Sequence, residues 1–138
     1  MRILAIDHGS RRIGLAVGDT ETRMAFARAA LRRRSAADDL ARLGELARVE
    51  GVERIVIGLP LNMDGSEGSQ AKAARAFGDA LAGIGLEIVY VDERLSSWEA
   101  AERLGAAGRR PTRESGELDS AAAAVFLQQY LDMTEETQ

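Results

Sequence analysis

The chain has 138 residues, 46% of them hydrophobic, so it is long and apolar enough for one compact domain over residues 1–138. It has no cysteine, which excludes disulfides and thiolate metal sites, and its formal net charge is -4. The apolar run after Met1 is too short for a signal peptide, and no stretch approaches the ~20 apolar residues of a membrane helix. We therefore expect a soluble, cytoplasmic protein with no membrane partner.

The first third of the chain predicts three strands. Residues 2–7 form a continuous apolar run, which is typical of a strand buried on both faces and should be central in its sheet. After a turn around Gly9 and Ser10, residues 12–18 form a second strand. Residues 24–32 form a third strand, weakened by four alanines.

The remainder alternates helices and strands. Ser35, with Asp38 three residues later, is a typical helix start, and Gly51 is a typical helix end. A later helix is predicted to be capped by Ser69 and to carry an apolar face of Ala73, Phe77 and Leu81. The other predicted elements are strands at 54–58 and 86–91, a helix from Ser96 to about residue 107, a basic loop at 108–116, a helix at 117–131 and a polar tail at 132–138.

This order predicts the fold class. A meander of strands followed by strand–helix–strand crossovers gives an α/β fold, a mixed five-stranded sheet with helices on both faces. The same order is found in ribonuclease H-like domains, which the chain resembles in this respect.

Asp7 is the first candidate for chemistry. It ends the first strand and is followed by His8 and Gly9, so its carboxylate can project where the backbone lets a phosphate approach. An ordinary Asp-x-Gly turn explains the segment equally well. The pattern also opens the phosphate-binding hairpin of actin-like ATPases, although that architecture needs two such domains. His8 alone is weak evidence, because lone histidines are usually structural.

Two further acidic positions follow in the sequence. Asp92 and Glu93 come directly after the fifth strand, where adjacent acids repel unless a cation compensates, and Arg94 can do so without a metal. Asp119 lies in the first turn of the last helix, where helix capping alone is sufficient to explain an acid. However, the alanines at 121–124 let this helix pack closely on the sheet, which brings Asp119 near the strand ends.

Carboxylates from two strand ends and one helix start form the arrangement that a two-metal site requires. Hard oxygen ligands select Mg²⁺ or Mn²⁺, and the single histidine gives little support for zinc. The sequence therefore indicates a metal-dependent phosphodiesterase as one interpretation of these acids.

Four ordered motifs resemble one family. They are Asp7-x-Gly-x-Arg-Arg-Ile-Gly, the segment at 58–68, Asp92-Glu-Arg-Leu-Ser-Ser and the segment at 119–131. Together they are similar to the YqgF family of Holliday junction resolvase-like proteins, which is linked to maturation of the 5′ end of 16S rRNA. The resemblance implies a ribonuclease H-like nuclease with Asp7, Glu93 and Asp119 as catalytic acids and metal ligands. His8, Glu114 and Glu117 depart from the family pattern, the last two at positions that are often basic.

Arginines offer contacts for nucleic acid despite the negative net charge. Of the 18 basic residues only Lys72 is a lysine, and the planar arginine side chain suits phosphate. Solvated surface charge is an equally good interpretation of any one cluster, including Arg32–Arg34. The loop at 58–68 is either a connector with a turn at Asp64–Gly65 or a phosphate-binding segment. The predicted nucleic-acid contacts are Arg11, Arg12, Asn62, Arg94, Arg109, Arg110 and Arg113.

The leading hypothesis is a metal-dependent nuclease that processes the 5′ end of the 16S rRNA precursor, as a monomer or homodimer. Cleavage of a branched DNA junction is the alternative within the same class. A non-catalytic nucleic-acid-binding module is the alternative of a different class, and uptake of Mg²⁺ at the three acids would separate it from an enzyme.

Overall fold

The computed structural model describes residues 1–93 and 117–136, and within the last helix it describes the side chains of residues 120–133. The predicted helix at 96–107 and the basic loop at 108–116 lie outside these ranges. So do four predicted nucleic-acid contacts, namely Arg94, Arg109, Arg110 and Arg113.

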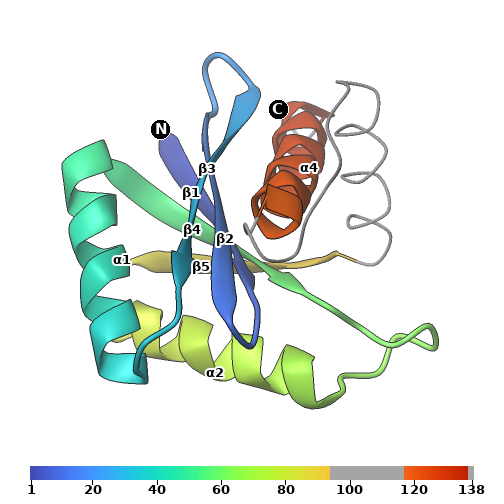
Figure 1. Ribbon diagram of the computed structural model, residues 1–138. Helices are drawn as coiled ribbons and strands as arrows, with labels where there is room; N and C mark the ends of the chain where they lie inside the picture. The colour runs from blue at the N-terminus through green and yellow to red at the C-terminus, as the bar shows by residue number, and fades with distance from the viewer. Residues whose placement is uncertain (94–116, 137–138) are drawn as a thin grey trace.

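A five-stranded sheet with the order β3-β2-β1-β4-β5 forms the centre of the molecule (Figure 1). Its first strand is central, as its apolar run predicts, and pairs antiparallel with β2 and parallel with β4. The sheet is therefore mixed. The strands are β1 (Arg2–His8), β2 (Arg12–Asp19), β3 (Met24–Arg32), β4 (Val52–Leu59) and β5 (Glu87–Asp92).

Helices cover both faces of this sheet, which confirms the predicted fold class (Figure 1). The helices α1 (Ala36–Glu50) and α2 (Ser69–Ala82) pack on one face, and α4 (Glu117–Glu136) packs on the other. The central strand supplies both cores, because Leu4 and Ile6 face α1 and α2 whereas Ile3 and Ala5 face α4. Such alternation follows from the period of two in a strand.

The helix ends follow from local chemistry. Ser35 Oγ accepts a hydrogen bond from the Asp38 amide at 3.1 Å, and Gly51 ends α1 in the left-handed conformation with φ of 69°. The prediction for α2 was wrong in two details. Gly68, not Ser69, is its capping residue, and Ala73 is exposed while Ala74 is buried.

The last helix runs to Glu136, so most of the predicted polar tail is helical. Gln128 Nε2 donates to Asp132 Oδ1 one turn further on, at 3.1 Å, and Gln128 Oε1 accepts from the Ala25 amide of β3 at 3.1 Å. The second of these contacts ties the helix to the edge strand β3. No helix within residues 1–93 and 117–136 is long and apolar enough to cross a membrane.

Candidate functional site

Asp7 lies at the carboxyl end of the central strand, half-buried and paired across the sheet with Gly14. Because Ile3 and Ala5 belong to the core under α4, the alternation of the strand places Asp7 on that face. His8 belongs to the opposite face, with Leu4 and Ile6.

Glu93 continues the β5 edge by one residue, since its amide donates to the Leu59 carbonyl at 3.2 Å. Its carboxylate lies over the α-carbon of Gly58 in β4. A methyl group at Gly58 would come 2.9 Å from Glu93 Cδ and 2.7 Å from Cε2 of Phe126. Glu93 Oε2 is screened from solvent, whereas the neighbouring Asp92 is exposed. Gly58 therefore provides the space for the Glu93 carboxylate on the face that α4 covers.

Asp7 at the end of β1 and the Glu93 carboxylate over β4 lie on neighbouring strands. Ile6 pairs with Ile57, and the residues that follow them are Asp7 and Gly58. Adjacent strands lie about 4.8 Å apart, so the carboxylate above Gly58 is within roughly one strand spacing of the end of β1. The structure thus brings Asp7 and Glu93 to one face and one end of the sheet. Their catalytic role stays a prediction.

The start of α4 is fixed at the same end of the sheet. Ser120 is 4% exposed, and its hydroxyl accepts a hydrogen bond from the Leu15 amide at 3.2 Å. Leu15 pairs with Ile6, the residue before Asp7. The backbone of Asp119, next to Ser120, is therefore close to the carboxyl end of β1, although the Asp119 side chain lies outside the described part. Ser120 was not predicted, because a serine after a helix start carries no distinctive signal.

Among the side chains that the structure describes, no three acids or histidines form a group that could hold a metal ion. That set excludes the side chain of Asp119. The two-metal arrangement therefore stays a prediction, to which the structure contributes the placement of Asp7, of Glu93 and of the α4 backbone.

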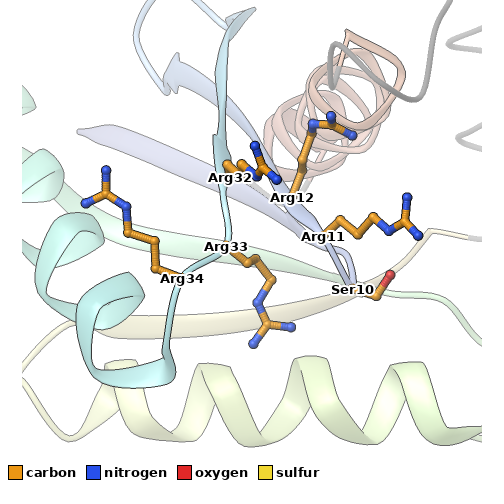
Figure 2. Close-up of a pocket in the computed structure, with 6 residues that line it drawn as sticks. All are labelled: Ser10, Arg11, Arg12, Arg32, Arg33 and Arg34. Carbon is orange, nitrogen blue, oxygen red and sulfur yellow. The ribbon is translucent and has the colours of Figure 1, made fainter.

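Two arginine runs meet beside this site and line a cavity of about 560 Å³ (Figure 2). The β1–β2 turn is tight, because the Gly9 amide donates to the Arg12 carbonyl at 2.9 Å and a methyl group at Gly9 would lie 2.7 Å from that oxygen. Arg12 pairs across the sheet with Arg32. The lining residues are Ser10, Arg11, Arg12, Arg32, Arg33 and Arg34.

Like charges that face each other across two strands repel, so this gathering of arginines suits a bound anion. Within the described ranges, no carboxylate forms an ion pair with Arg11, Arg32 or Arg34. Arg11 and Arg12 were predicted as contacts, whereas the role of Arg32–Arg34 was left open. The pairing of residues 12 and 32 brings the two runs together, and predicting it would have required the register of β2 and β3.

Asp39 holds one part of this arginine cluster, the Arg33 side chain and the Arg34 backbone. Its side chain is fully buried and accepts hydrogen bonds from Arg42 Nη2 at 2.6 Å, Arg33 Nε at 3.4 Å and the Arg34 amide at 3.1 Å. Burial raises the pKa of Asp39, but these hydrogen bonds outweigh burial and leave its pKa lowered overall. The carboxylate therefore stays ionised and orients Arg33.

Asn62, the remaining predicted contact, closes the loop before α2. Its side-chain amide donates to Ser66 Oγ at 3.0 Å, and its backbone amide donates to the Ser66 carbonyl at 2.9 Å. Gly65 has φ of 87°, which gives the predicted turn at Asp64–Gly65. These bonds assign Asn62 a structural role, and its contact with a substrate stays a prediction.

A family model described as "RuvX: Holliday junction resolvase" matches residues 1–133. The chain belongs to this family. Its RuvX relatives include a protein of Anaeromyxobacter dehalogenans strain 2CP-1 that is 50% identical over 133 residues, covering 96% of this chain and 97% of the relative. A relative from Synechococcus elongatus is 46% identical over 130 residues, covering 94% and 87%. Both bear the name "Putative pre-16S rRNA nuclease".

Solved structures confirm the fold. RuvC of T. thermophilus in complex with a Holliday junction substrate matches with a TM-score of 0.64 and 15% identity, covering 99% of this chain and 97% of RuvC. The large terminase nuclease of phage G20c matches with a TM-score of 0.55 and 15% identity, covering 90% and 80%. Family and relatives confirm the predicted class, a nuclease that hydrolyses phosphodiester bonds and has nucleic acid as its partner.

Proposed function

We propose that this RuvX-family chain holds Mg²⁺ or Mn²⁺ with Asp7, Glu93 and Asp119 and hydrolyses phosphodiester bonds of the 16S rRNA precursor in the cytoplasm. The position of the Glu93 carboxylate supports the proposal most directly. It lies over Gly58, on the same face and at the same end of the sheet as Asp7. An acid placed so closely against backbone and the ring of Phe126 is held in one orientation, as a metal ligand must be.

The donor set fits such ions. Asp7 and Glu93 offer carboxylate oxygens from neighbouring strand ends, and the bond between Leu15 and Ser120 places the start of α4 beside them. Hard oxygen donors without sulfur select Mg²⁺ or Mn²⁺. When bound, the metal ions supply a Lewis acid that activates water and stabilises the leaving oxygen.

The remaining predicted residues orient the nucleic acid. Arg11 and Arg12 lie beside the end of β1, where they can bind backbone phosphates on each side of the bond that is cut. Asn62, Arg94, Arg109, Arg110 and Arg113 complete the proposed contacts. Positively charged contacts of this kind position a substrate and carry no sequence information by themselves.

The names of the relatives at 46–50% identity favour the rRNA precursor as substrate. The description of the family model favours a second candidate, the Holliday junction. Symmetric cleavage of a junction needs a two-fold dimer, whereas cleavage of one RNA strand is compatible with a monomer. Solution mass measured beside activity therefore discriminates between the two.

The test uses a labelled 16S precursor transcript and a four-way DNA junction, each with Mg²⁺, Mn²⁺, Ca²⁺ or a chelator. We expect cleavage of the RNA with Mg²⁺ or Mn²⁺, and binding without appreciable turnover with Ca²⁺. Asp7→Asn and Glu93→Gln should abolish cleavage. Glu45→Gln, at an exposed ion pair on α1, is the matched control and should be fully active.

Cleavage of the junction alone would select the second candidate. Normal cleavage by Asp7→Asn, or undiminished cleavage in excess chelator, would contradict the metal site. Binding of RNA without cleavage under any of these conditions would favour a non-catalytic binding module.

A further inference from the structure

A second cavity, of about 230 Å³, lies on the other face of the β1 end, between the β1–β2 turn and the start of α2. We call it the His8 pocket. Ser10 and Arg33 line both this pocket and the larger arginine cavity, so the two adjoin each other. Figure 2 shows Arg33 pointing from the end of β3 toward α2. The full lining is His8, Gly9, Ser10, Arg33, Ser69, Gln70 and Ala73.

His8 lines this pocket and has a buried ring nitrogen. The residue is only 9% exposed, its ring packs against Phe77 at 4.7 Å between centroids, and its Nε2 has no hydrogen-bond partner among the residues described. Burial lowers the pKa of His8, and the charge of Arg33 lowers it further. A buried polar nitrogen without a partner costs about 1–3 kcal/mol, a cost that a bound acceptor would remove.

The other walls of the pocket also present donors. The 14-residue helix α2 begins here, and its capping residue Gly68 makes no side-chain hydrogen bond to the first-turn amides. The amides at such a helix start carry partial positive charge and favour an anion. Arg33 is held on the opposite wall by Asp39 at 3.4 Å and by the Gly9 carbonyl at 3.3 Å. None of the described lining residues is acidic.

We propose that the His8 pocket is a second phosphate-binding site, which takes a backbone phosphate of the nucleic-acid strand on the face of the sheet opposite Asp7 and Glu93. The inference rests on the proposed function in one respect, that the ligand is the substrate strand. Nε2 of His8, in the tautomer that carries a proton there, and the Arg33 guanidinium donate to the phosphate oxygens. The volume suffices for a phosphate group with water, since one water occupies about 30 Å³.

Because the arginine cavity adjoins the His8 pocket, a polymer that spans both is favoured over a free anion. A strand that leaves the metal site passes over the β1–β2 turn and meets Arg11 and Arg12 before it reaches Arg33. Successive phosphates of the nucleic acid would then bind successive arginine side chains. The nucleic-acid strand would thus contact Asp7 on one face of the sheet and His8, the next residue, on the other face.

The first test measures binding of a fluorescein-labelled precursor RNA oligonucleotide in Ca²⁺. His8→Leu fills the space without a donor and should weaken binding about 10-fold or more, the range for a hydrogen bond to a charged group. In His8→Gln the side-chain amide can replace Nε2, so affinity should return to within about 3-fold of wild type. In Mg²⁺, His8→Leu should raise KM while kcat changes little, which a displaced Asp7 would not produce.

Arg33→Gln should weaken binding and reduce the salt slope by about one unit. The matched control is Arg48→Gln, which removes an arginine from an exposed pair on α1 and should leave binding and salt slope unchanged. Thermal melting of each variant identifies any loss of fold. If His8→Leu and Arg33→Gln bind as wild type does, the proposal is wrong, even where the RNA is cleaved normally.

The second test needs no variant, because His8 is the single histidine of the chain. Its ring ¹⁵N resonances are therefore unambiguous in the spectrum of the wild-type protein. Titration with the RNA should shift the Nε2 resonance, whereas inorganic phosphate at about 10 mM should not. An equal shift with inorganic phosphate would overturn the assignment to a strand, and no shift with saturating RNA would overturn the site. Binding at His8 without cleavage would leave the site standing and contradict the proposed nuclease activity instead.

Discussion

Gly58→Ala tests whether the space above β4 is required for the Glu93 carboxylate. The new methyl group would lie 2.7 Å from Cε2 of Phe126 and 2.9 Å from Cδ of Glu93. Carbon atoms in contact are normally about 3.5–4.0 Å apart, so both neighbours must retreat by several tenths of an ångström. Phe126 is 1% exposed and packed in the core under α4, whereas Glu93 ends a strand. The carboxylate is the group that moves more easily.

We expect two effects of different size. Overpacking of this kind costs about 1–3 kcal/mol of the free energy of unfolding, which urea denaturation measures. Displacement of a catalytic group by about 1 Å can cost about 100-fold in rate, so kcat for RNA cleavage should fall more than the loss of stability explains.

The matched control is Gly78→Ala on α2. A methyl group there would lie 2.5 Å from Tyr90 Oη and 2.7 Å from Ile57 Cδ1, a comparable clash on the face opposite the acids. This variant should lose stability, partly offset by about 1 kcal/mol from the better helix propensity of alanine, and keep its kcat. Equal activity of the two variants at a temperature where both are folded would refute the reasoning.

Three further changes have definite expected outcomes. Ser120→Ala leaves the buried Leu15 amide without its acceptor and should cost about 1–3 kcal/mol in urea denaturation, with a fall in cleavage as the start of α4 shifts. The pKa of Asp39 is lowered in the folded state, so its contribution to stability is present at neutral pH and is lost as pH falls through that pKa. Asp39→Asn should therefore be less stable than wild type at pH 7, and the difference should vanish in strong acid; a constant difference down to about pH 2 would contradict this. The third change is alanine at the arginines of the predicted basic loop, namely Arg109, Arg110 and Arg113. It should weaken RNA binding and reduce the salt slope of binding by about one unit per phosphate contact, with little change in kcat. An unchanged salt slope would argue against these contacts.

The fold was largely predictable because its elements carry strong local signals. The apolar run of β1 identified the central strand, and Ser35 and Gly51 marked the two ends of α1. The prediction was wrong where tertiary contacts decide. Ala73 and Ala74 are alike in sequence, and only packing of α2 on the sheet buries one of them. The extension of α4 to Glu136 likewise has no apolar signal in the polar sequence after Leu131.

The site was predictable only in part, for a related reason. Motifs indicated Asp7 and Glu93, and the structure places both on the face of the sheet under α4. The residues that hold the site together were not visible in the sequence. Ser120 acts through a bond to Leu15, and Asp39 acts from a buried position beneath two arginines. Such supporting roles arise from three-dimensional proximity, and a single sequence gives no distance between segments far apart in the chain.

The negative net charge of the chain is compatible with a polyanionic substrate because the charges are separated in space. Asp7 and Glu93, two of the proposed metal ligands, lie at the end of β1 on the α4 face, where cations would neutralise them. The arginines gather around the adjacent β1–β2 turn, and no described carboxylate lines their cavity. A strand approaching this end meets a local positive potential, which governs association more than the net charge does. The tightness of the turn at Gly9 keeps the two groups adjacent, since a side chain there would collide with the Arg12 carbonyl. Any residue with a Cβ at position 9 should therefore weaken binding and cleavage together, whereas changes at the arginines alone should weaken only binding.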